Sequence, residues 1–334
     1  MSKYPKIAVF GGGSWATAIV KMLSENLNEI GWYMHNENTI SHLKEYHHNP
    51  NYLSSVQFDM DKLYLGSDME AMVNYAEYLI FVIPSAYLQG ELNKIASESL
   101  KDKIVFSAIK GIVPESSLIV GEHFNTHYKV PFCNIGVISG PCHAEEVALE
   151  RLSYLTLASA EEKISQTLAT CLRSHYIKCK ISDDLLGLEY AAMLKNIYAV
   201  AAGIAHGLGY GDNFQSVLMS NAIREMKRYV KCVHNTKRNI NDSGYLGDLL
   251  VTGYSVFSRN RMFGNMIGKG YTVRSAQFEM NMVAEGYFAA KSAYELNQQR
   301  DKKAKTPIIK TVYKILYKNK DPKKAFQKLT NKLD

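Results

Sequence analysis

Lys195 is the residue whose type and setting most clearly indicate chemistry. It lies within residues 189–203, a stretch of otherwise small and apolar residues whose spacing predicts a helix. Removing an ammonium group from water disfavours its charged form, so a buried lysine must find a partner, face a cavity or lose its proton. A snorkelling surface lysine is the alternative, but neighbours this small and apolar argue against it. Proton transfer is the chemistry that such a lysine indicates.

A glycine-rich loop near the start of the chain indicates which reaction the proton would serve. The pattern Gly11-x-Gly13-x-x-Ala16 directly follows a strand-like run at 7–10 and opens a predicted helix. Gly11 permits a tight turn, Gly13 lets a pyrophosphate approach the backbone, and Ala16 lets the helix pack closely on the strand. The helix N-terminus also attracts phosphate. With Lys195, this loop predicts a nicotinamide-dependent oxidoreductase, against the alternative of a merely structural turn.

The end of the second predicted strand normally decides between NAD and NADP. An acidic residue there meets the ribose 2′-hydroxyl, whereas a basic one accommodates a 2′-phosphate. Residues 32–37 read Trp-Tyr-Met-His-Asn-Glu, so that His35 or Asn36 could contact the ribose or its phosphate. This pattern leaves the choice between NAD and NADP open.

The elements that must position these residues change character along the chain. Continuous apolar runs, typical of strands buried on both faces of a parallel sheet, occur at 7–10, 29–33, 78–83, 103–108 and 134–139. Their alternation with helices predicts a Rossmann-type doubly wound parallel α/β sheet for residues 1–182. Apolar residues then recur with helical period at 185–208, 214–233, 247–255, 283–296 and 308–317. Residues 183–334 are therefore predicted to form an all-α domain, with the binding site in the cleft between the two domains.

The charge and composition exclude several other classes of protein. The net charge of +7 arises at the C-terminal end, because residues 300–334 contribute +9 and the rest of the chain −2. Apolar residues at helical spacing there predict an amphipathic helix with a solvated lysine face, and the absence of interleaved aromatics argues against a nucleic-acid partner. Five cysteines without C-x-x-C pairing predict reduced thiols and no metal site. With no signal peptide and no membrane span expected, the sequence predicts a cytoplasmic protein.

Four further segments place polar residues beside glycine, proline or predicted strand ends. Lys110 follows the fourth strand, and the run 139–146 follows the fifth. Asp248 and Thr252 lie four residues apart on one helix face. The Ser-Arg-Asn-Arg run at 258–261 supplies a guanidinium that could bind a phosphate through two hydrogen bonds.

Eight motifs in order along the chain carry a family resemblance. They are Gly-Gly-Gly-Ser-Trp-Ala-Thr-Ala (11–18), Lys110-Gly111, Ser-Gly-Pro-x-x-Ala-x-Glu-Val-Ala (139–148), Leu194-Lys195-Asn196 with Ala201-Ala202-Gly203, Gly207-Leu208-Gly209-x-Gly211-Asp212-Asn213, Gly247-Asp248-Leu249-x-Val251-Thr252, Ser258-Arg259-Asn260 and Val283-Ala284-Glu285-Gly286. Together they resemble the NAD(P)-dependent glycerol-3-phosphate dehydrogenases. The resemblance implies a homodimer that reversibly reduces dihydroxyacetone phosphate to sn-glycerol 3-phosphate and supplies glycerophospholipid synthesis.

The resemblance also implies roles for individual residues. Lys195 matches the general acid/base. The positions that match substrate contacts are Lys110, Gly140, Cys142, Lys195, Asp248, Ser258, Arg259 and Asn260. Those that match contacts to NAD or NADP are Ser14, Trp15, Lys110, Ala144, Arg259, Val283 and Glu285, beside Gly11, Gly13 and His35 from the loop and strand patterns.

The chain departs from the family pattern at three positions. Ala16 replaces the usual glycine of the loop, and Cys142 stands where Ser or Thr is usual, which removes one hydroxyl donor. Met34 replaces the common basic residue two places after Trp32, which weakens an NADP assignment.

Simpler roles and other functions remain as alternatives. Asp248 and Arg259 could form a structural ion pair, Asn260 could cap a helix, and Glu285 could be a solvated helix charge. The chain could instead be a hydroxyacid-type dehydrogenase with another phosphorylated or acyl substrate. A non-catalytic dinucleotide sensor, whose basic tail contacts a partner, is the alternative from a different class.

Overall fold

The computed structural model describes residues 4–280 and 284–334, and its contacts divide the chain into two compact units. The sheet unit comprises Met1–Ile109 and Leu118–Leu185, and the helical unit comprises Lys110–Ser117 and Leu186–Asp334. The short segment that begins with Lys110 thus belongs to the helical unit. The predicted boundary at residues 182/183 stays a prediction.

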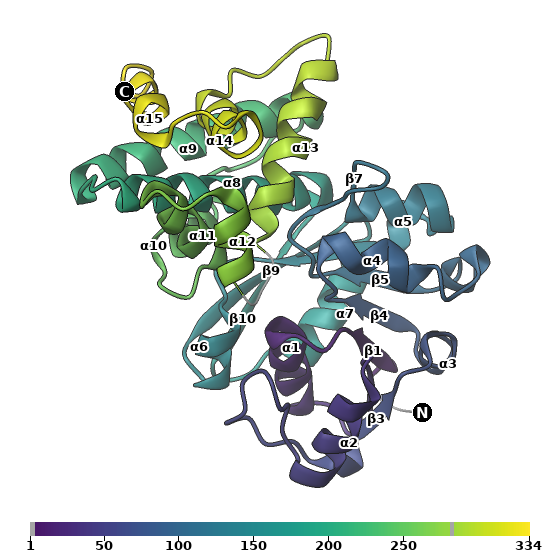
Figure 1. Cartoon of the computed structure of the whole chain (residues 1–334). Helices are drawn as coiled ribbons and strands as arrows, with labels where there is room; N and C mark the ends of the chain where they lie inside the picture. The colour runs from purple at the N-terminus through teal and green to yellow at the C-terminus, as the bar shows by residue number, and fades with distance from the viewer. Residues whose placement is uncertain (1–3, 281–283) are drawn as a thin grey trace. The chain divides into compact units, whose positions relative to one another are not determined.

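The sheet unit is built on one eight-stranded sheet with helices in its connections (Figure 1). In spatial order the strands are β10 (Ile177–Ser182), β9 (Ser153–Ser159), β8 (Ile135–Ser139), β5 (Ile104–Ser107), β4 (Tyr78–Phe81), β1 (Ile7–Phe10), β2 (Ile30–Tyr33) and β3 (Leu63–Gly66). All neighbours pair in parallel except β8 and β9, which are antiparallel. The carboxyl ends of β1, β2 and β4 therefore lie at the same edge, where a doubly wound sheet binds its ligand.

The connections of the sheet unit are mostly short helices. They are α1 (Ser14–Ser24), α2 (Glu37–Tyr46), α3 (Met69–Tyr75), α4 (Ser85–Leu92), α5 (Val120–Tyr128), α6 (Ala144–Ala148) and α7 (Glu162–Leu172), with the two-residue strand β7 (Leu118–Ile119) before α5. Three single turns of 3₁₀ helix, at Met60–Lys62, Ser97–Leu100 and Phe132–Asn134, each precede a strand.

The five predicted strands are confirmed, each with both ends within two residues of the prediction, but three strands of the eight-stranded sheet were missed. β10 reads Ile-Lys-Cys-Lys-Ile-Ser and β3 reads Leu-Tyr-Leu-Gly, and both lie at an edge of the sheet. An edge strand can expose every second side chain, so it lacks the continuous apolar run by which the inner strands were recognised. The antiparallel β9 was missed because serine and threonine interrupt its apolar residues.

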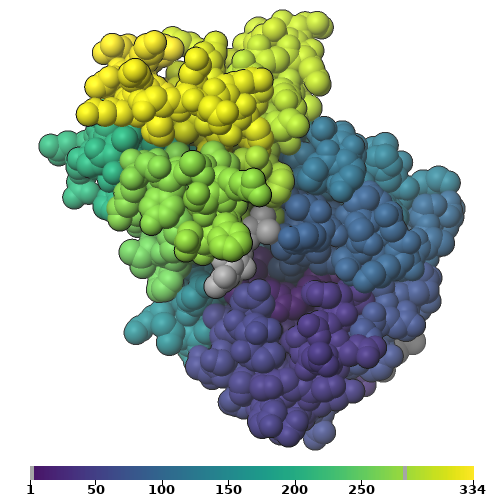
Figure 2. All heavy atoms as spheres, viewed as in Figure 1, coloured from purple at the N-terminus to yellow at the C-terminus, as the bar shows by residue number. Residues whose placement is uncertain are grey.

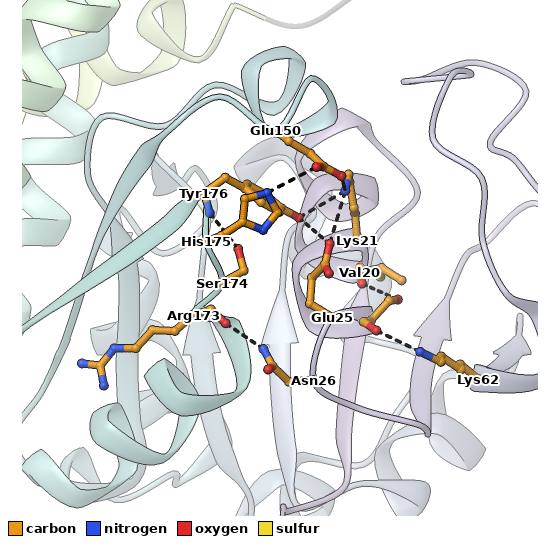
Figure 3. Close-up of polar contacts among 11 residues, drawn as sticks. Val20, Lys21, Glu25, Asn26, Lys62, Glu150, Arg173, Ser174, His175 and Tyr176 are labelled. Atoms are coloured by element: carbon orange, nitrogen blue, oxygen red, sulfur yellow. Dashed lines mark hydrogen bonds and ion pairs between the residues drawn. The ribbon is translucent and has the colours of Figure 1, made fainter.

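Helix α1, which follows the glycine-rich loop, is anchored at its C-terminal end by a cluster of polar contacts (Figure 3). Lys21 Nζ lies 2.8 Å from the Glu150 carboxylate and donates to the Tyr176 hydroxyl over 3.2 Å. That hydroxyl in turn donates to Glu25 over 3.0 Å, and Asn26 donates to two backbone carbonyls at the C-terminal end of α7. These contacts tie α1 to the segments that flank β9 and β10.

The helical unit contains most of the remaining elements. They are β6 (Ile112–Val113), α8 (Leu185–Gly207), α9 (Asp212–Val233), a π-helical turn (Ser243–Gly247), α10 (Asp248–Tyr254), α11 (Arg259–Gly268), α12 (Val273–Glu279), α13 (Glu285–Gln299), α14 (Pro307–Lys318) and α15 (Pro322–Thr330). The five predicted helical segments are confirmed. Helices α11, α12 and α15 were not predicted, because their apolar residues are few and their lengths short.

Helix α8 is buried from Gly187 to Ala205, and its glycines let other helices approach its backbone. A Cβ atom on Gly203 would lie 2.0 Å from the carbonyl oxygen of Arg261 in α11, and one on Gly264 of α11 would lie 2.1 Å from Val200 O. Gly286, near the start of α13, makes a similar approach, since its Cβ would lie 2.6 Å from Asn196 O. The small residues therefore hold the N-terminal parts of α11 and α13 at fixed positions relative to Lys195.

The C-terminal segment matches its predicted amphipathic pattern. Ile308, Ile309, Val312, Ile315 and Leu316 of α14 are buried. All eleven lysines of residues 302–332 are exposed, and the atoms of this segment, yellow in Figure 2, form part of the visible surface. In the part of the chain that the structure describes, no helix is long and apolar enough to cross a membrane.

Candidate functional site

The helical unit buries an ion pair between Lys195 and Asp248. Lys195 is 3% exposed, and its Nζ donates to Asp248 Oδ1. The other carboxylate oxygen, Oδ2, lies 3.8 Å from Lys110 Nζ, so one carboxylate forms ion pairs with two ammonium groups. The interpretation of Lys195 as a snorkelling surface lysine is wrong, because its ammonium group is enclosed and paired with a buried carboxylate.

Burial lowers the pKa of Lys195 from 10.5 to about 7. Desolvation is the largest cause, since the charged ammonium loses its water. The negative charge of Asp248 and its hydrogen bond raise the pKa in part, and the positive charge of Lys110 lowers it again. An ammonium group held in this balance can give up a proton near neutral pH, which is what a general acid requires.

Asn196, the neighbour of Lys195 on α8, holds the backbone of Lys110. Its Nδ2 donates to the carbonyl oxygen of Lys110 over 2.7 Å. The sequence motif contained this asparagine, but no role was predicted for it. A buried amide beside a buried ammonium was the available signal, because both must find partners inside an apolar helix bundle.

The N-terminus of α11 carries three of the residues predicted to contact the substrate. Ser258 is the N-cap, and its Oγ accepts the backbone N–H of Arg261 over 3.3 Å. Arg259 begins the helix and is half-buried. Asn260 is buried, and its Oδ1 accepts the N–H of Gly286 over 2.8 Å, so it does cap the start of α13. A helix N-terminus with an arginine in its first turn is suited to bind a phosphate group.

The acidic Glu285 opens α13 and is half-buried rather than fully solvated. A carboxylate in the first turn interacts favourably with the helix dipole. Val283, also predicted to contact the cofactor, lies outside the described residues.

The sheet unit gathers the predicted dinucleotide residues at strand ends. Gly11 follows β1 with φ +134°, and a Cβ there would lie 2.8 Å from Val82 O, so only glycine fits. A Cβ on Gly13 would meet no described atom within 4 Å, which leaves open space against the loop. Ser14 is buried and Trp15 half-buried in the first turn of α1. These positions suit a pyrophosphate lying on a helix N-terminus.

The residues predicted from the end of β2 have different surroundings. Met34 is buried, and it lies 3.2 Å from where a Cβ of Gly12 would be. His35 is exposed, whereas the side chain of Asn36 accepts the N–H groups of Asn38 and Thr39 and so caps α2. Asn36 is thereby less available for a ribose than the sequence indicated.

Gly140, Cys142 and Ala144 follow the end of β8. Gly140 has φ +109°, and a Cβ there would lie 2.7 Å from Tyr154 O in β9. Cys142 is buried, and Ala144 begins α6. None of the five cysteines, all of which lie within the described residues, forms a disulfide. Among residues 4–280 and 284–334, no group of three His, Cys, Asp or Glu side chains is placed to hold a metal ion.

A mostly parallel sheet with a dinucleotide-type loop and a helical unit with a buried lysine–aspartate pair define an NAD(P)-dependent dehydrogenase. Comparison with known proteins identifies the family. The models for the N-terminus and the C-terminus of NAD-dependent glycerol-3-phosphate dehydrogenase match residues 6–165 and 184–327. The chain belongs to this family, which confirms the resemblance that the motifs carried.

Individual relatives cover nearly the whole chain. Glycerol-3-phosphate dehydrogenase (NAD(P)+) of Staphylococcus carnosus is 34% identical over 94% of both chains, and that of Macrococcus caseolyticus is 32% identical over 98% of both. Among solved structures, glycerol-3-phosphate dehydrogenase of Coxiella burnetii has a TM-score of 0.89 and 27% identity, covering 98% of this chain and 99% of that one. The fold is thus that of the family from end to end.

Proposed function

We infer that this protein reversibly reduces dihydroxyacetone phosphate to sn-glycerol 3-phosphate with NADH or NADPH. The observation that carries the inference is the buried Lys195–Asp248 pair with Lys110 beside it, in a chain of the glycerol-3-phosphate dehydrogenase family. Its product is the backbone precursor of glycerophospholipids, so the enzyme would supply their synthesis.

The residues of the sheet unit fit a nicotinamide dinucleotide. The glycine-rich loop leaves open space at Gly13, and the first turn of α1 follows it directly. Gly11, Gly13, Ser14 and Trp15 would hold the pyrophosphate, whose negative charge the helix N-terminus favours. His35, Ala144 and Glu285 are proposed as further contacts. When bound, the dinucleotide supplies the hydride that reduces the ketone carbon.

Lys195 provides the proton that this reduction requires. As the carbonyl carbon gains a hydride, its π electrons move to the oxygen, and the Lys195 ammonium stabilises that charge and transfers its proton there. The lysine is left neutral, and in the oxidation direction the same amine accepts the hydroxyl proton. Asp248 orients the ammonium group, and Lys110 adds a second positive charge to the site.

The phosphate of the substrate is proposed to lie at the N-terminus of α11. Ser258, Arg259 and Asn260 stand there, and the close packing of α11 on α8 fixes their position relative to Lys195. Gly140 and Cys142 are proposed as further substrate contacts. Binding energy from a group remote from the ketone then helps to orient the reacting carbon.

The Arg259→Ala variant should raise the KM for dihydroxyacetone phosphate about 10- to 100-fold, the usual range for losing a hydrogen-bonded charge. Turnover of unphosphorylated dihydroxyacetone should change little, because that substrate has no phosphate group for Arg259 to bind. The measurement is initial rates at saturating cofactor, with Arg274→Ala, an exposed arginine of α12, as the control. An unchanged KM for the phosphorylated substrate would contradict this role.

The proposed function is tested by following oxidation of NADH and of NADPH separately with dihydroxyacetone phosphate. Oxidation of either supports the proposal, and the ratio of kcat/KM values gives the cofactor preference. Turnover of 3-hydroxyacyl or sugar-acid substrates instead would identify a hydroxyacid-type dehydrogenase. Cofactor binding without turnover of any substrate would identify a dinucleotide sensor.

We also propose that the protein is a cytoplasmic homodimer. Apolar side chains are exposed on α9, α10, α11 and the loop between α10 and α11, namely Val217, Leu250, Tyr254, Val256, Phe257 and Met262. Such a grouping supports a second copy of the chain as the partner. Light scattering checks the mass, and a monomer at micromolar concentration would contradict the proposal. The five cysteines, none of which forms a disulfide, support a reducing compartment.

A further inference from the structure

The carbonyl groups of the glycine-rich loop are held in place by hydrogen-bond donors. Trp32 Nε1 donates to Gly11 O over 2.7 Å, and Thr17 Oγ1 donates to Gly13 O over 3.0 Å. The C=O and N–H of a trans peptide point in opposite directions. A side chain that donates to the carbonyl oxygen therefore fixes the N–H of the same peptide so that it points away from that side chain. Three consecutive glycines would otherwise leave these peptides free to rotate.

Asn49 holds the middle carbonyl of the loop. It comes from the segment after α2 and is 1% exposed. Its Nδ2 donates to Gly12 O and to Thr17 Oγ1, each over 3.0 Å. Its Oδ1 accepts the N–H groups of Asn51 over 3.0 Å and Tyr52 over 3.2 Å.

The amide group of Asn49 is thus fully used and has one possible orientation. A carbonyl oxygen and a hydroxyl lie beside its nitrogen, and two backbone N–H groups lie beside its oxygen. In the reversed orientation the amide oxygen would face the carbonyl oxygen, and the amide NH₂ would face the two N–H groups. A buried side chain with all four bonds made is rigid, and it transfers that rigidity to the Gly12–Gly13 peptide.

We propose that Asn49, with its partner Thr17, is a positioning residue for the dinucleotide. It holds the Gly12–Gly13 peptide so that the Gly13 N–H, not the Gly12 carbonyl, faces the pyrophosphate. Released from Asn49, the peptide could present the partial negative charge of its carbonyl to the phosphate oxygens. The inference rests on the proposed function, since it takes the loop to bind a dinucleotide. NADH and NADPH share the pyrophosphate, so Asn49 acts on both equally.

Direct binding titrations of NADH and NADPH test the role of Asn49. We expect the Asn49→Ala and Asn49→Asp variants to bind both cofactors about tenfold more weakly, the usual result of losing one or two net hydrogen bonds. Asn49→Asp is the sharper variant, because it keeps an acceptor for Asn51 N–H and Tyr52 N–H but replaces the donor to Gly12. The KM for dihydroxyacetone phosphate at saturating cofactor should stay within twofold of the unmodified protein.

The matched control is Asn51→Ala, which removes an exposed side chain from the same segment and should leave both Kd values unchanged. A folded Asn49→Asp variant with an unchanged Kd would overturn the inference. So would a loss confined to one cofactor, since that result would indicate contact with the ribose.

Thr17 keeps the inference testable if neither Asn49 variant folds. Thr17→Val removes one acceptor of Asn49 and the bond to Gly13 O, whereas Thr17→Ser retains both. Weaker binding of both cofactors by Thr17→Val alone would support the proposed network, and equal binding by the two variants would overturn it. If the unmodified protein binds neither cofactor, the proposed function fails, and not the assignment of Asn49 within it.

Discussion

Replacing Lys195 by methionine should lower kcat for dihydroxyacetone phosphate reduction by about 100-fold or more. General acid catalysis typically contributes 10²- to 10⁴-fold, and methionine keeps the length of the side chain but carries no proton to donate. The affinity for NADH should change little, because the loop that is proposed to bind it belongs to the sheet unit. Stopped-flow measurement of a single turnover separates the loss in chemistry from any change in product release.

Two further variants sharpen the Lys195 experiment. Lys195→Arg keeps a positive charge at this position, but a guanidinium group does not release its proton near neutral pH. The activity of this variant should therefore stay low. Lys310→Met removes an exposed lysine of α14 and serves as the control. Turnover of Lys195→Met within threefold of the unmodified protein would rule out Lys195 as the general acid.

Replacing Asp248 by asparagine should shift the pH dependence of reduction toward lower pH. Reduction needs the protonated form of Lys195, so the rate falls as the pH rises through the pKa of this lysine. Burial already lowers that pKa to about 7, while the charge of Asp248 raises it. Without this charge the pKa falls further, and the protonated fraction above it drops about tenfold for each unit. We expect kcat/KM for reduction at pH 7.5 to fall about 10- to 100-fold.

The same substitution should also affect the stability of the helical unit. Removing one partner of a buried ion pair leaves the other charge uncompensated, although Lys195 can shed its proton to limit the cost. We expect a loss of about 1–3 kcal/mol in the free energy of unfolding, measured by urea denaturation. Asp301→Asn, at an exposed turn, is the control. An unshifted pH profile in a folded Asp248→Asn variant would contradict the orienting role of Asp248.

Five of the six inner strands of the sheet, all except β9, were predictable because strands buried on both faces consist of continuous apolar runs such as 78–83. The edge strands β3 and β10 were not, since a strand with one neighbour can expose polar side chains on alternate positions. The antiparallel pairing of β9 with β8 depends on the direction in which the chain runs through the sheet, and no residue pattern in the two strands predicts that direction.

Within the sequence itself, Lys195 could be recognised as a buried cation, and the glycine-rich loop as a phosphate-binding turn. Local composition determines both, because an ammonium group in an apolar helix and three glycines after a strand each have few stable environments. The sequence does not show which groups contact Lys195 and the loop. Asp248 lies 53 residues from Lys195, and Asn49 lies 37 residues from Gly12.

The tertiary structure alone decided these partners, because they are brought together by packing between elements and not by spacing along one. Backbone contact at Gly203 and Gly264 places α11 against α8. The segment after α2 folds onto the loop, so that Asn49, for which the sequence predicted no role, becomes a buried hydrogen-bond donor to Gly12 O. Residue types thus specified the chemistry that each site can perform. The three-dimensional arrangement set the charge balance on Lys195 and the orientation of the loop, since electrostatic and hydrogen-bond energies depend on distances that the order of residues does not contain.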